Sequence, residues 1–173
     1  MLICGLRQAI HLKISAHRFK ILKMITAPYM EIAMEEAVEA AERGEVPVGA
    51  VIVDAVRGEV LSRAGNCIIA NNDPTAHAEI IAIRKATSIL ASPRLEKCDL
   101  YVTLEPCPMC AAAISFARIR RLYFGAYDPK GGGVDHGSRV FQHSSCHHRP
   151  EVIGGIQESK ASELLKSFFE DLR

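Results

Sequence analysis

Neither a long apolar run nor a strong net charge is found in this sequence of 173 residues. Without an apolar stretch of the roughly 18 residues that suggest a membrane span, we expect no membrane association. The net charge is only +1, and residues 31–173 carry 16 basic against 20 acidic side chains, since five of the 21 Lys and Arg residues and none of the acids lie in residues 1–30. A strongly basic domain is the usual footprint of nucleic-acid binding. Any nucleic-acid contact must therefore depend on a local patch of positive charge.

Cysteines are too few and too dispersed for a disulfide scaffold. The six lie at positions 4, 67, 98, 107, 110 and 146, and only Cys107 and Cys110 are closely spaced. In an intracellular protein, a C-x-x-C pair of this kind more often indicates metal or redox chemistry than a structural bridge. A second C-x-x-C pair, which a structural site of four cysteines requires, is missing.

The first 25 residues lack both acidic side chains and an apolar core. Their basic residues interrupt any apolar segment, which argues against a secretory signal. The composition is similar to that of an organelle transit peptide, although Ser15 is its one serine. An upstream start codon is a further interpretation, because Met24 and Met30 would also serve as starts. We therefore treat residues 1–25 as an N-terminal extension of open role, and residues 26–173 as a single domain of a cytoplasmic protein.

Apolar periodicity and turn-forming residues indicate helices and strands that alternate along the chain. Helices are expected over residues 28–43, 74–90, 108–117 and 158–172, and strands over residues 48–53, 60–64, 99–104, 121–127 and 152–156. Asp73 is expected to cap the second helix, with Pro74 in its first position. The short turn at Arg57-Gly58 makes the first two strands an antiparallel hairpin. This order predicts an α/β fold in which helices cover both faces of a sheet.

Two short segments combine residues typical of a catalytic zinc site. One contains His77 and Glu79 in the pattern H-x-E, and the other contains Cys107 and Cys110 in the pattern P-C-x-x-C. One imidazole and two thiolates make a three-ligand zinc set, which leaves the fourth position open for water, and zinc lowers the pKa of such water to about 7. Both segments are expected at helix starts, where free backbone N–H groups and the positive end of the helix dipole stabilise thiolates.

Glu79 is placed for proton transfer rather than for metal binding. It lies two residues beyond His77, or about 200° around a helix, so it is a poor neighbour of the ligand face. It can instead approach the water from beside the substrate, as a general acid and base.

The specificity of these motifs comes from their combination. Alone, a C-x-x-C pair could be a redox pair or half of a structural site, and a helical histidine is more often a core residue. Together, H-x-E and P-C-x-x-C about 30 residues apart are the signature of zinc deaminases that act on nucleobases.

Longer segments around these motifs are similar to a known family. The segments EVPVGAV (45–51), DPTAHAEI (73–80) and YVTLEPC (101–107) resemble the bacterial tRNA-specific adenosine deaminases, and the similarity runs from about residue 29 to residue 172. The resemblance implies a three-layer α/β/α, cytidine-deaminase-like fold with a mixed five-stranded sheet. It also implies a homodimer with one zinc per chain, which converts the wobble adenosine of a tRNA anticodon stem-loop to inosine by hydrolysis.

The same resemblance assigns residues to the site. It makes His77, Cys107 and Cys110 the zinc ligands and Glu79 the catalytic proton carrier, and it places Asn66 against the target nucleotide. For Asn66 the alternative is a turn residue that closes the second strand.

The sequence departs from the family's pattern where RNA contacts are expected. The last helix ends in a mixture of charges, and the loop of residues 128–139 contains Asp135-His136 and an additional glycine. RNA contacts are expected from residues 130–139, from His143, His147, His148 and Arg149, and from Phe168 or Phe169 of the last helix. We expect one of the two phenylalanines to pack in the core instead.

Two other functions are open at this point. A free-base or nucleoside deaminase, acting for example on guanine or cytosine, would have the same zinc pattern. A structural zinc module in an RNA-binding protein would not be an enzyme at all. Glu79 argues against the structural module, because such a site needs a fourth ligand and no proton carrier.

Overall fold

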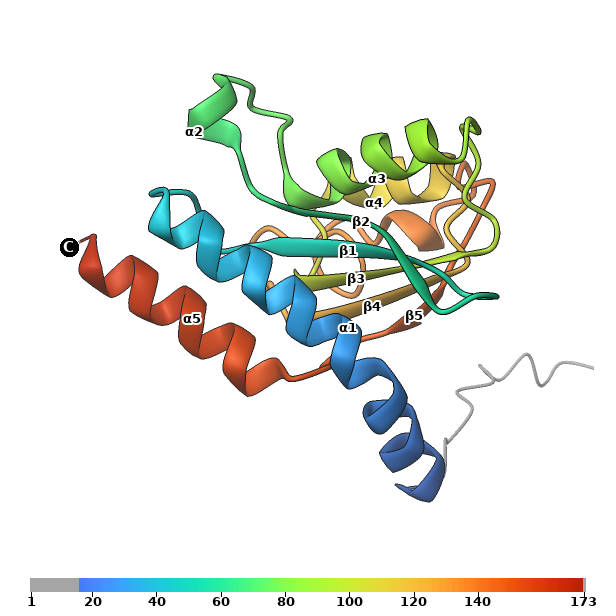
Figure 1. Cartoon of the computed structure of the whole chain (residues 1–173), viewed down its shortest axis with the longest axis horizontal. Helices are drawn as coiled ribbons and strands as arrows, with labels where there is room; N and C mark the ends of the chain where they lie inside the picture. The colour runs from blue at the N-terminus through green and yellow to red at the C-terminus, as the bar shows by residue number, and fades with distance from the viewer. Residues whose placement is uncertain (1–15, 173) are drawn as a thin grey trace, which may run out of the picture.

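Five strands and six helical segments alternate along residues 16–172, the part of the chain that the computed structural model describes (Figure 1). The elements are α1 (Ala16–Glu42), β1 (Gly49–Asp54), β2 (Glu59–Gly65), α2 (Ile68–Asn71), α3 (Ala78–Ile89), β3 (Cys98–Leu104), α4 (Pro108–Phe116), β4 (Arg121–Ala126), the 3-10 helix η1 (Val140–Gln142), β5 (Glu151–Ile153) and α5 (Glu158–Asp171). Within these described residues, none of the helices has the length and apolarity that a bilayer crossing needs.

The strands form one mixed sheet in the order β2-β1-β3-β4-β5. β1 pairs antiparallel with β2 and β3, whereas β3 pairs parallel with β4, and β4 with β5. Gly58, with a φ of +71°, lies in the turn that closes the expected β1–β2 hairpin. Parallel strands need a crossover connection, and α4 supplies the one between β3 and β4. The mixed five-stranded sheet is thus confirmed.

Alternate residues along each strand fill two separate cores. On one face, Ala50 and Ile52 of β1 pack with Phe124 of β4 beneath α3 and α4. On the other face, Val51 and Val53 pack beneath α1. Figure 1 shows α1 and α5 on one side of the sheet and α3 and α4 on the other. This arrangement confirms the three-layer α/β/α architecture.

Three tyrosines stack between α1 and the sheet. The rings of Tyr101 and Tyr123, on the neighbouring strands β3 and β4, lie nearly parallel with centroids 4.5 Å apart, and the ring of Tyr29 in α1 lies 5.2 Å from that of Tyr101. The Tyr29 hydroxyl also donates to Gly58 O at 2.9 Å. Aromatic pairs contribute about 0.5–1.5 kcal/mol beyond the area that they bury, so this stack helps to fix α1 on the sheet.

A glycine at the start of β1 lets α1 approach the sheet closely. A Cβ atom at Gly49 would lie 2.0 Å from Ala33 O and 2.6 Å from Ala37 N in α1. Gly49 N donates to Thr103 Oγ1 of β3 at 3.1 Å. Because Val48 directly precedes this contact, the close approach also positions a residue that lines the cavity described below.

The first helix begins earlier than the sequence suggested. α1 starts at Ala16, so Pro28 lies inside the helix and not at its first position. A proline inside a helix removes one hydrogen bond and its ring crowds the carbonyl group four residues earlier, at a cost of about 3 kcal/mol or more, so sequence rules place it at a helix start. Residues 16–25 of the N-terminal extension therefore belong to α1, and residues 1–15 lie outside the described part of the chain. The role of the extension stays a prediction.

The start of the second long helix was also predicted wrongly. α3 begins at Ala78 rather than at Pro74, and Asp73 does not cap it. Asp73 Oδ1 instead accepts from Thr75 N at 2.8 Å and from Thr75 Oγ1 at 2.7 Å, which forms a local turn ahead of the helix. The short helices α2 and η1 were not expected, and β5 spans Glu151–Ile153 rather than residues 152–156.

Candidate active site

Three potential metal ligands meet where α3 and α4 begin. His77 is the N-cap of α3, and Cys107 is the N-cap of α4. Cys110 is the third residue of α4, and its side chain is buried. The expectation that both motifs open helices is therefore confirmed, and the sheet brings the two helix starts together.

Distances within this cluster fit a tetrahedral zinc ion. His77 Nδ1 lies 3.7 Å from Cys107 Sγ and 3.6 Å from Cys110 Sγ. Zinc bonds of about 2.3 Å to sulfur and about 2.05 Å to nitrogen, at the tetrahedral angle, hold those atoms roughly 3.6 Å apart. Across residues 16–172, no fourth His, Cys, Asp or Glu joins this group. A three-ligand site leaves one position open, which is typical of catalytic rather than structural zinc.

Hydrogen bonds and burial set the charge on the two cysteines. The hydrogen bond from Cys110, together with that from His77, lowers the pKa of Cys107 to about 4. The same bond to Cys107, followed by burial, raises the pKa of Cys110. The pKa of His77 is raised by its hydrogen bond with Cys107. The cluster thus already favours a thiolate, the form in which cysteine binds a metal.

The carboxyl group of Glu79 is buried beside this cluster, in the first turn of α3. Glu79 is only 3% exposed, and within residues 16–172 its Oε2 has no hydrogen-bond partner. Burial raises the pKa of Glu79 to about 7. Buried polar atoms normally have partners, so an unpaired oxygen here indicates a group reserved for a ligand. A carboxyl group that titrates near neutral pH can both accept and donate a proton.

A cavity of about 220 Å³ opens onto these side chains. Its walls combine apolar residues with the chemically active ones: Val46, Val48, Asn66, Ile68, His77, Glu79, Leu104, Glu105, Cys107, Asp128 and Gly131. This volume lies below the roughly 300–1,000 Å³ that is usual for drug-sized ligands. The cavity is therefore of a size for one small group, such as a single base, and it places that group against Glu79.

Asn66 lies between β2 and the start of α3. Its Oδ1 accepts from Ala78 N at 2.9 Å, so this amide satisfies the first N–H group of α3 in place of Asp73. Asn66 is 4% exposed and lines the cavity together with His77 and Glu79. Asn66 thus both follows the end of β2, as the turn interpretation has it, and lines the cavity of the candidate site. Contact between Asn66 and a nucleotide stays a prediction.

A second buried carboxylate, that of Glu105, was missed by the sequence analysis. Its Oε1 accepts the N–H groups of residues 134–136 at 2.8–3.2 Å, and its Oε2 accepts Asp128 N at 3.0 Å and lies 2.8 Å from His136 Nδ1. Although burial alone raises the pKa of Glu105, these hydrogen bonds outweigh it and lower the pKa. The carboxylate of Glu105 thereby holds one wall of the cavity. The one feature of the sequence that could have indicated this role is the position of Glu105 directly before the P-C-x-x-C motif.

The histidine-rich segment is only partly available for contacts with RNA. His143, His147 and Arg149 are exposed. His148 is half-buried, and its Nε2 lies 2.6 Å from Ile119 O, which ties this segment to the turn after α4. The structure therefore gives His148 a packing role.

In α5, the two phenylalanines differ in exposure, but neither belongs to one of the two cores, where one of them was expected. Phe168 is half-buried, whereas Phe169 is 48% exposed. Phe169 is consequently the one of the pair that is free to stack on a base.

Known proteins share this arrangement. The family model of the cytidine and deoxycytidylate deaminase zinc-binding region matches residues 25–126. The tRNA-specific adenosine deaminase of Agrobacterium fabrum is 57% identical over 145 residues, which is 84% of this chain and 94% of that protein. A structure solved in a study of A-to-I editing by tRNA:A34 deaminases at the wobble position superposes with a TM-score of 0.78 and 57% identity, over 80% of this chain and 99% of the other.

A guanine deaminase from Nitrosomonas europaea is more distant. It superposes with a TM-score of 0.71 at 20% identity, over 81% of this chain and 82% of the other, and so shares the fold alone. The fold thus occurs in an enzyme for a different base, whereas the 57% identity is to a tRNA-specific adenosine deaminase and to a structure from a study of tRNA:A34 deaminases. The chain belongs to the cytidine and deoxycytidylate deaminase family of zinc-binding deaminases and, within it, to the tRNA-specific adenosine deaminases.

Proposed function

We propose that this chain converts adenosine to inosine at the wobble position of a tRNA anticodon, by hydrolysis. The observation that carries the proposal is the buried side chain of Glu79. One of its carboxyl oxygens is unpaired, and the side chain lines the cavity together with His77 and Cys107. The 57% identity to a tRNA-specific adenosine deaminase supports adenosine in tRNA as the substrate.

The residues of the cavity divide the chemistry among them. His77, Cys107 and Cys110 would hold a zinc ion, which would supply a Lewis acid that lowers the pKa of water toward about 7. Glu79 takes a proton from the attacking water while the water oxygen adds to C6 of adenine, and passes that proton to the ring nitrogen N1. Glu79 then carries the remaining proton of the added hydroxyl group to the exocyclic amine. The C6–N bond breaks, ammonia leaves and the carbonyl group of inosine forms.

A base must leave its stack to reach Glu79, which is 3% exposed. Flipping a base from an anticodon loop costs less than flipping one from a duplex, because loop bases are already partly unstacked. The apolar side chains of Val46, Val48 and Ile68 are suited to contact the faces of the base. Since Asn66 Oδ1 is occupied by Ala78 N, the amide Nδ2 is the group that Asn66 offers to the nucleotide.

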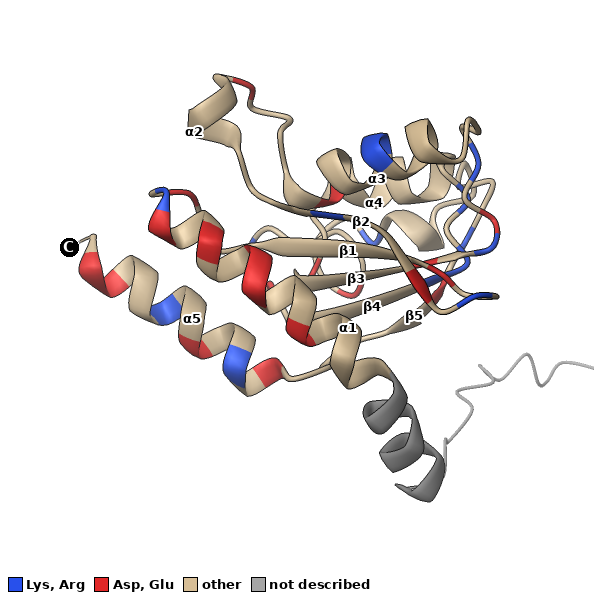
Figure 2. Ribbon diagram, in the orientation of Figure 1, with Lys and Arg blue, Asp and Glu red and all other residues tan. Residues whose placement is uncertain are grey.

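Charge limits the direction from which RNA approaches. The outer side of α1 carries the exposed acids Glu31, Glu35, Glu39 and Glu42, and Figure 2 shows this row of negative charge. Lys130 and Arg139 are exposed on the loop that follows the cavity-lining Asp128. We therefore assign the RNA phosphates to residues 130–139 and to the exposed part of residues 142–149. With so few phosphate contacts, activity falls with salt less steeply than for a strongly basic protein.

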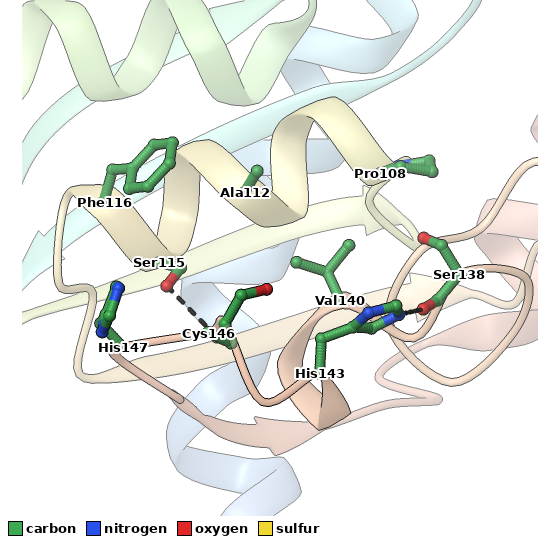
Figure 3. Close-up of a pocket in the computed structure, with 10 residues that line it drawn as sticks. Pro108, Ala112, Ser115, Phe116, Ser138, Val140, His143, Cys146 and His147 are labelled. Atoms are coloured by element: carbon green, nitrogen blue, oxygen red, sulfur yellow. Dashed lines mark hydrogen bonds between the residues drawn. The ribbon is translucent and has the colours of Figure 1, made fainter.

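The proposal includes a homodimer that forms through α4. This helix carries no charged residue, and Phe116 at its end is 77% exposed. Figure 3 shows Phe116 and Ala112 of α4 beside a cavity of about 290 Å³, which Cys146 also lines and across which Ser115 of α4 is hydrogen-bonded to Cys146. A groove of about 430 Å³ between α3 and α4 lies on the other side of Phe116. An exposed aromatic side chain between two such hollows, on a helix without charges, supports an interface between subunits at this place.

The test of the proposed function is a comparison of substrates. The proposed reaction is assigned to the cytoplasm, and purified protein is assayed with an anticodon stem-loop, a scrambled hairpin and free nucleobases. Steady-state rates should favour the anticodon stem-loop by orders of magnitude, with ammonia and inosine formed in equal amounts. Comparable or faster turnover of free guanine or cytosine would contradict the proposal and assign the chain to the deaminases of free bases.

A further inference from the structure

The short helix α2 has no packing of its own that explains its stability. It contains four residues, Ile68–Asn71, and none of them is buried. Figure 1 shows α2 projecting beyond the start of α3. A single helical turn is unstable in isolation, because nucleation costs more than one hydrogen bond returns. Its geometry must therefore be imposed by another part of the chain.

That part is the side chain of Glu45, in the turn between α1 and β1. Its Oε2 accepts Ile68 N at 3.0 Å, and its Oε1 accepts Ile69 N and Ala70 N, both at 2.9 Å. Glu45 is 2% exposed, and across residues 16–172 no Lys, Arg or His forms an ion pair with it. Its charge is met by the free N–H groups at the start of α2, groups that a helix cannot satisfy internally.

Glu45 is itself fixed to the rest of the fold. Its N–H group donates to Ala40 O at 3.0 Å, at the end of α1. Glu45 therefore connects the end of α1, through its backbone N–H group, to α2 on the rim of the cavity, through its carboxylate. Because Ile68 lines the cavity and its own N–H group is bound by Glu45, a shift of this carboxylate moves the wall of the cavity.

We propose that Glu45 is a positioning residue for the target base. It does not line the cavity, but it fixes α2, and through α2 it sets where Ile68 contacts the base. Together with Glu105, which holds the loop of residues 128–136 on another wall, it makes the cavity rigid before the substrate arrives. Displacements of about 1 Å at such a wall cost up to about 100-fold in rate, because the reacting atoms lose their alignment. The identity of the base that Glu45 positions rests on the proposed function, whereas the contacts between Glu45 and α2 do not.

The test is Glu45→Gln, which keeps the size of the side chain and replaces one acceptor oxygen with a donor that faces N–H groups. Asp99→Asn is the matched control, because Asp99 is also a buried carboxylate, 5% exposed. It lies at the start of β3, away from the cavity at the end of that strand, and it pairs with Arg120. We expect Glu45→Gln to keep its zinc, to lose about tenfold or more in kcat/KM, and to exchange the amide hydrogens of residues 68–70 faster. Asp99→Asn should lose thermal stability while keeping kcat/KM within about twofold.

Two results would overturn the role of Glu45. One is a Glu45→Gln variant with unchanged kcat/KM, and the other is an equal loss of kcat/KM in both variants, which would indicate general destabilisation. If the wild-type protein acts on a free base and ignores the stem-loop, the proposed function fails. The same pair of variants, assayed on that base, then still decides whether Glu45 positions the cavity wall.

Discussion

The proposed zinc ligands come from the starts of two helices, α3 and α4, so we expect the loss of one ligand to affect the fold as well as the metal. Cys107→Ala should lose the metal and all measurable deamination. It should also lower the melting temperature, because metal binding and folding are coupled where ligands come from separate segments. Zinc content by elemental analysis and thermal unfolding check both points.

The control for this variant is Cys98→Ala. Cys98 is a buried thiol at the far end of β3, so its loss removes core packing and leaves the ligands in place. It should keep one zinc per chain and normal activity despite some loss of stability. Full zinc occupancy in Cys107→Ala would refute the ligand assignment.

For Glu79 we expect a separation of metal binding from rate. Glu79→Ala should keep one zinc per chain, since Glu79 is not among the ligands, and should lose about 10²–10⁴-fold in turnover with the loss of general acid and base catalysis. Single-turnover assays of inosine formation measure this loss. Glu39→Ala, which removes an exposed acid from α1, serves as the control and should behave as wild type. Near-normal turnover of Glu79→Ala would rule out its role as proton carrier.

The residues proposed to do the chemistry have a pattern in the sequence, whereas those that hold the cavity have none. Zinc chemistry restricts His77, Cys107 and Cys110 to a few residue types at short spacings, and this restriction is visible in a single sequence. Glu45 binds backbone N–H groups 23–25 residues away, and Glu105 binds backbone N–H groups 23–31 residues away. Any residue type supplies such an N–H group, so their partners leave no pattern to find.

At the scale of helices and strands, the sequence predicted which elements exist better than where they start. The strand periodicity indicated all five strands of the sheet. The start of α3 was placed four residues too early, because local capping rules favoured Asp73, whereas the acceptor that meets Ala78 N is Asn66, 12 residues away. A cap from a distant segment cannot be recognised by local rules. The same argument explains why α2, held by Glu45, was not expected.

The N-terminal extension provides a prediction at this scale. A protein that begins at Met24 should fold, bind zinc and deaminate normally, because the described core residues of α1, Met30, Ala33, Ala37 and Ala40, all follow that position. A protein that begins at Met34 should be insoluble or unstable, since it loses Tyr29, Met30 and Ala33 from the core beneath α1. Solubility, zinc content and activity of the two proteins are compared. Loss of zinc or activity on starting at Met24 would show that the extension belongs to the domain.

At the scale of the whole molecule, the proposed dimer makes a prediction about one exposed side chain. Phe116→Lys places a charge in the apolar surface of α4, and removal of a central aromatic anchor typically costs 2 kcal/mol or more of binding free energy, or about 30-fold in the dissociation constant. The variant should therefore dissociate at a protein concentration about 30-fold or more above that at which the wild type dissociates, as measured by light scattering over a dilution series. Phe169→Lys, which changes an exposed phenylalanine on α5, should leave the dimer intact. A dimer of unchanged mass in Phe116→Lys would exclude the α4 interface.

The tyrosine stack beneath α1 has a spectroscopic consequence. The chain contains four tyrosines and no tryptophan, and three of the four, Tyr29, Tyr101 and Tyr123, lie in that stack. Near-ultraviolet circular dichroism should therefore come mainly from the α1 side of the sheet, without an indole signal to mask it. Chelation of zinc should leave this signal largely unchanged, whereas detachment of α1 should reduce it, because Tyr29 leaves the group and Tyr101 loses that contact. The two faces of the sheet can thus be followed separately during unfolding, one by its aromatic signal and the other by its metal.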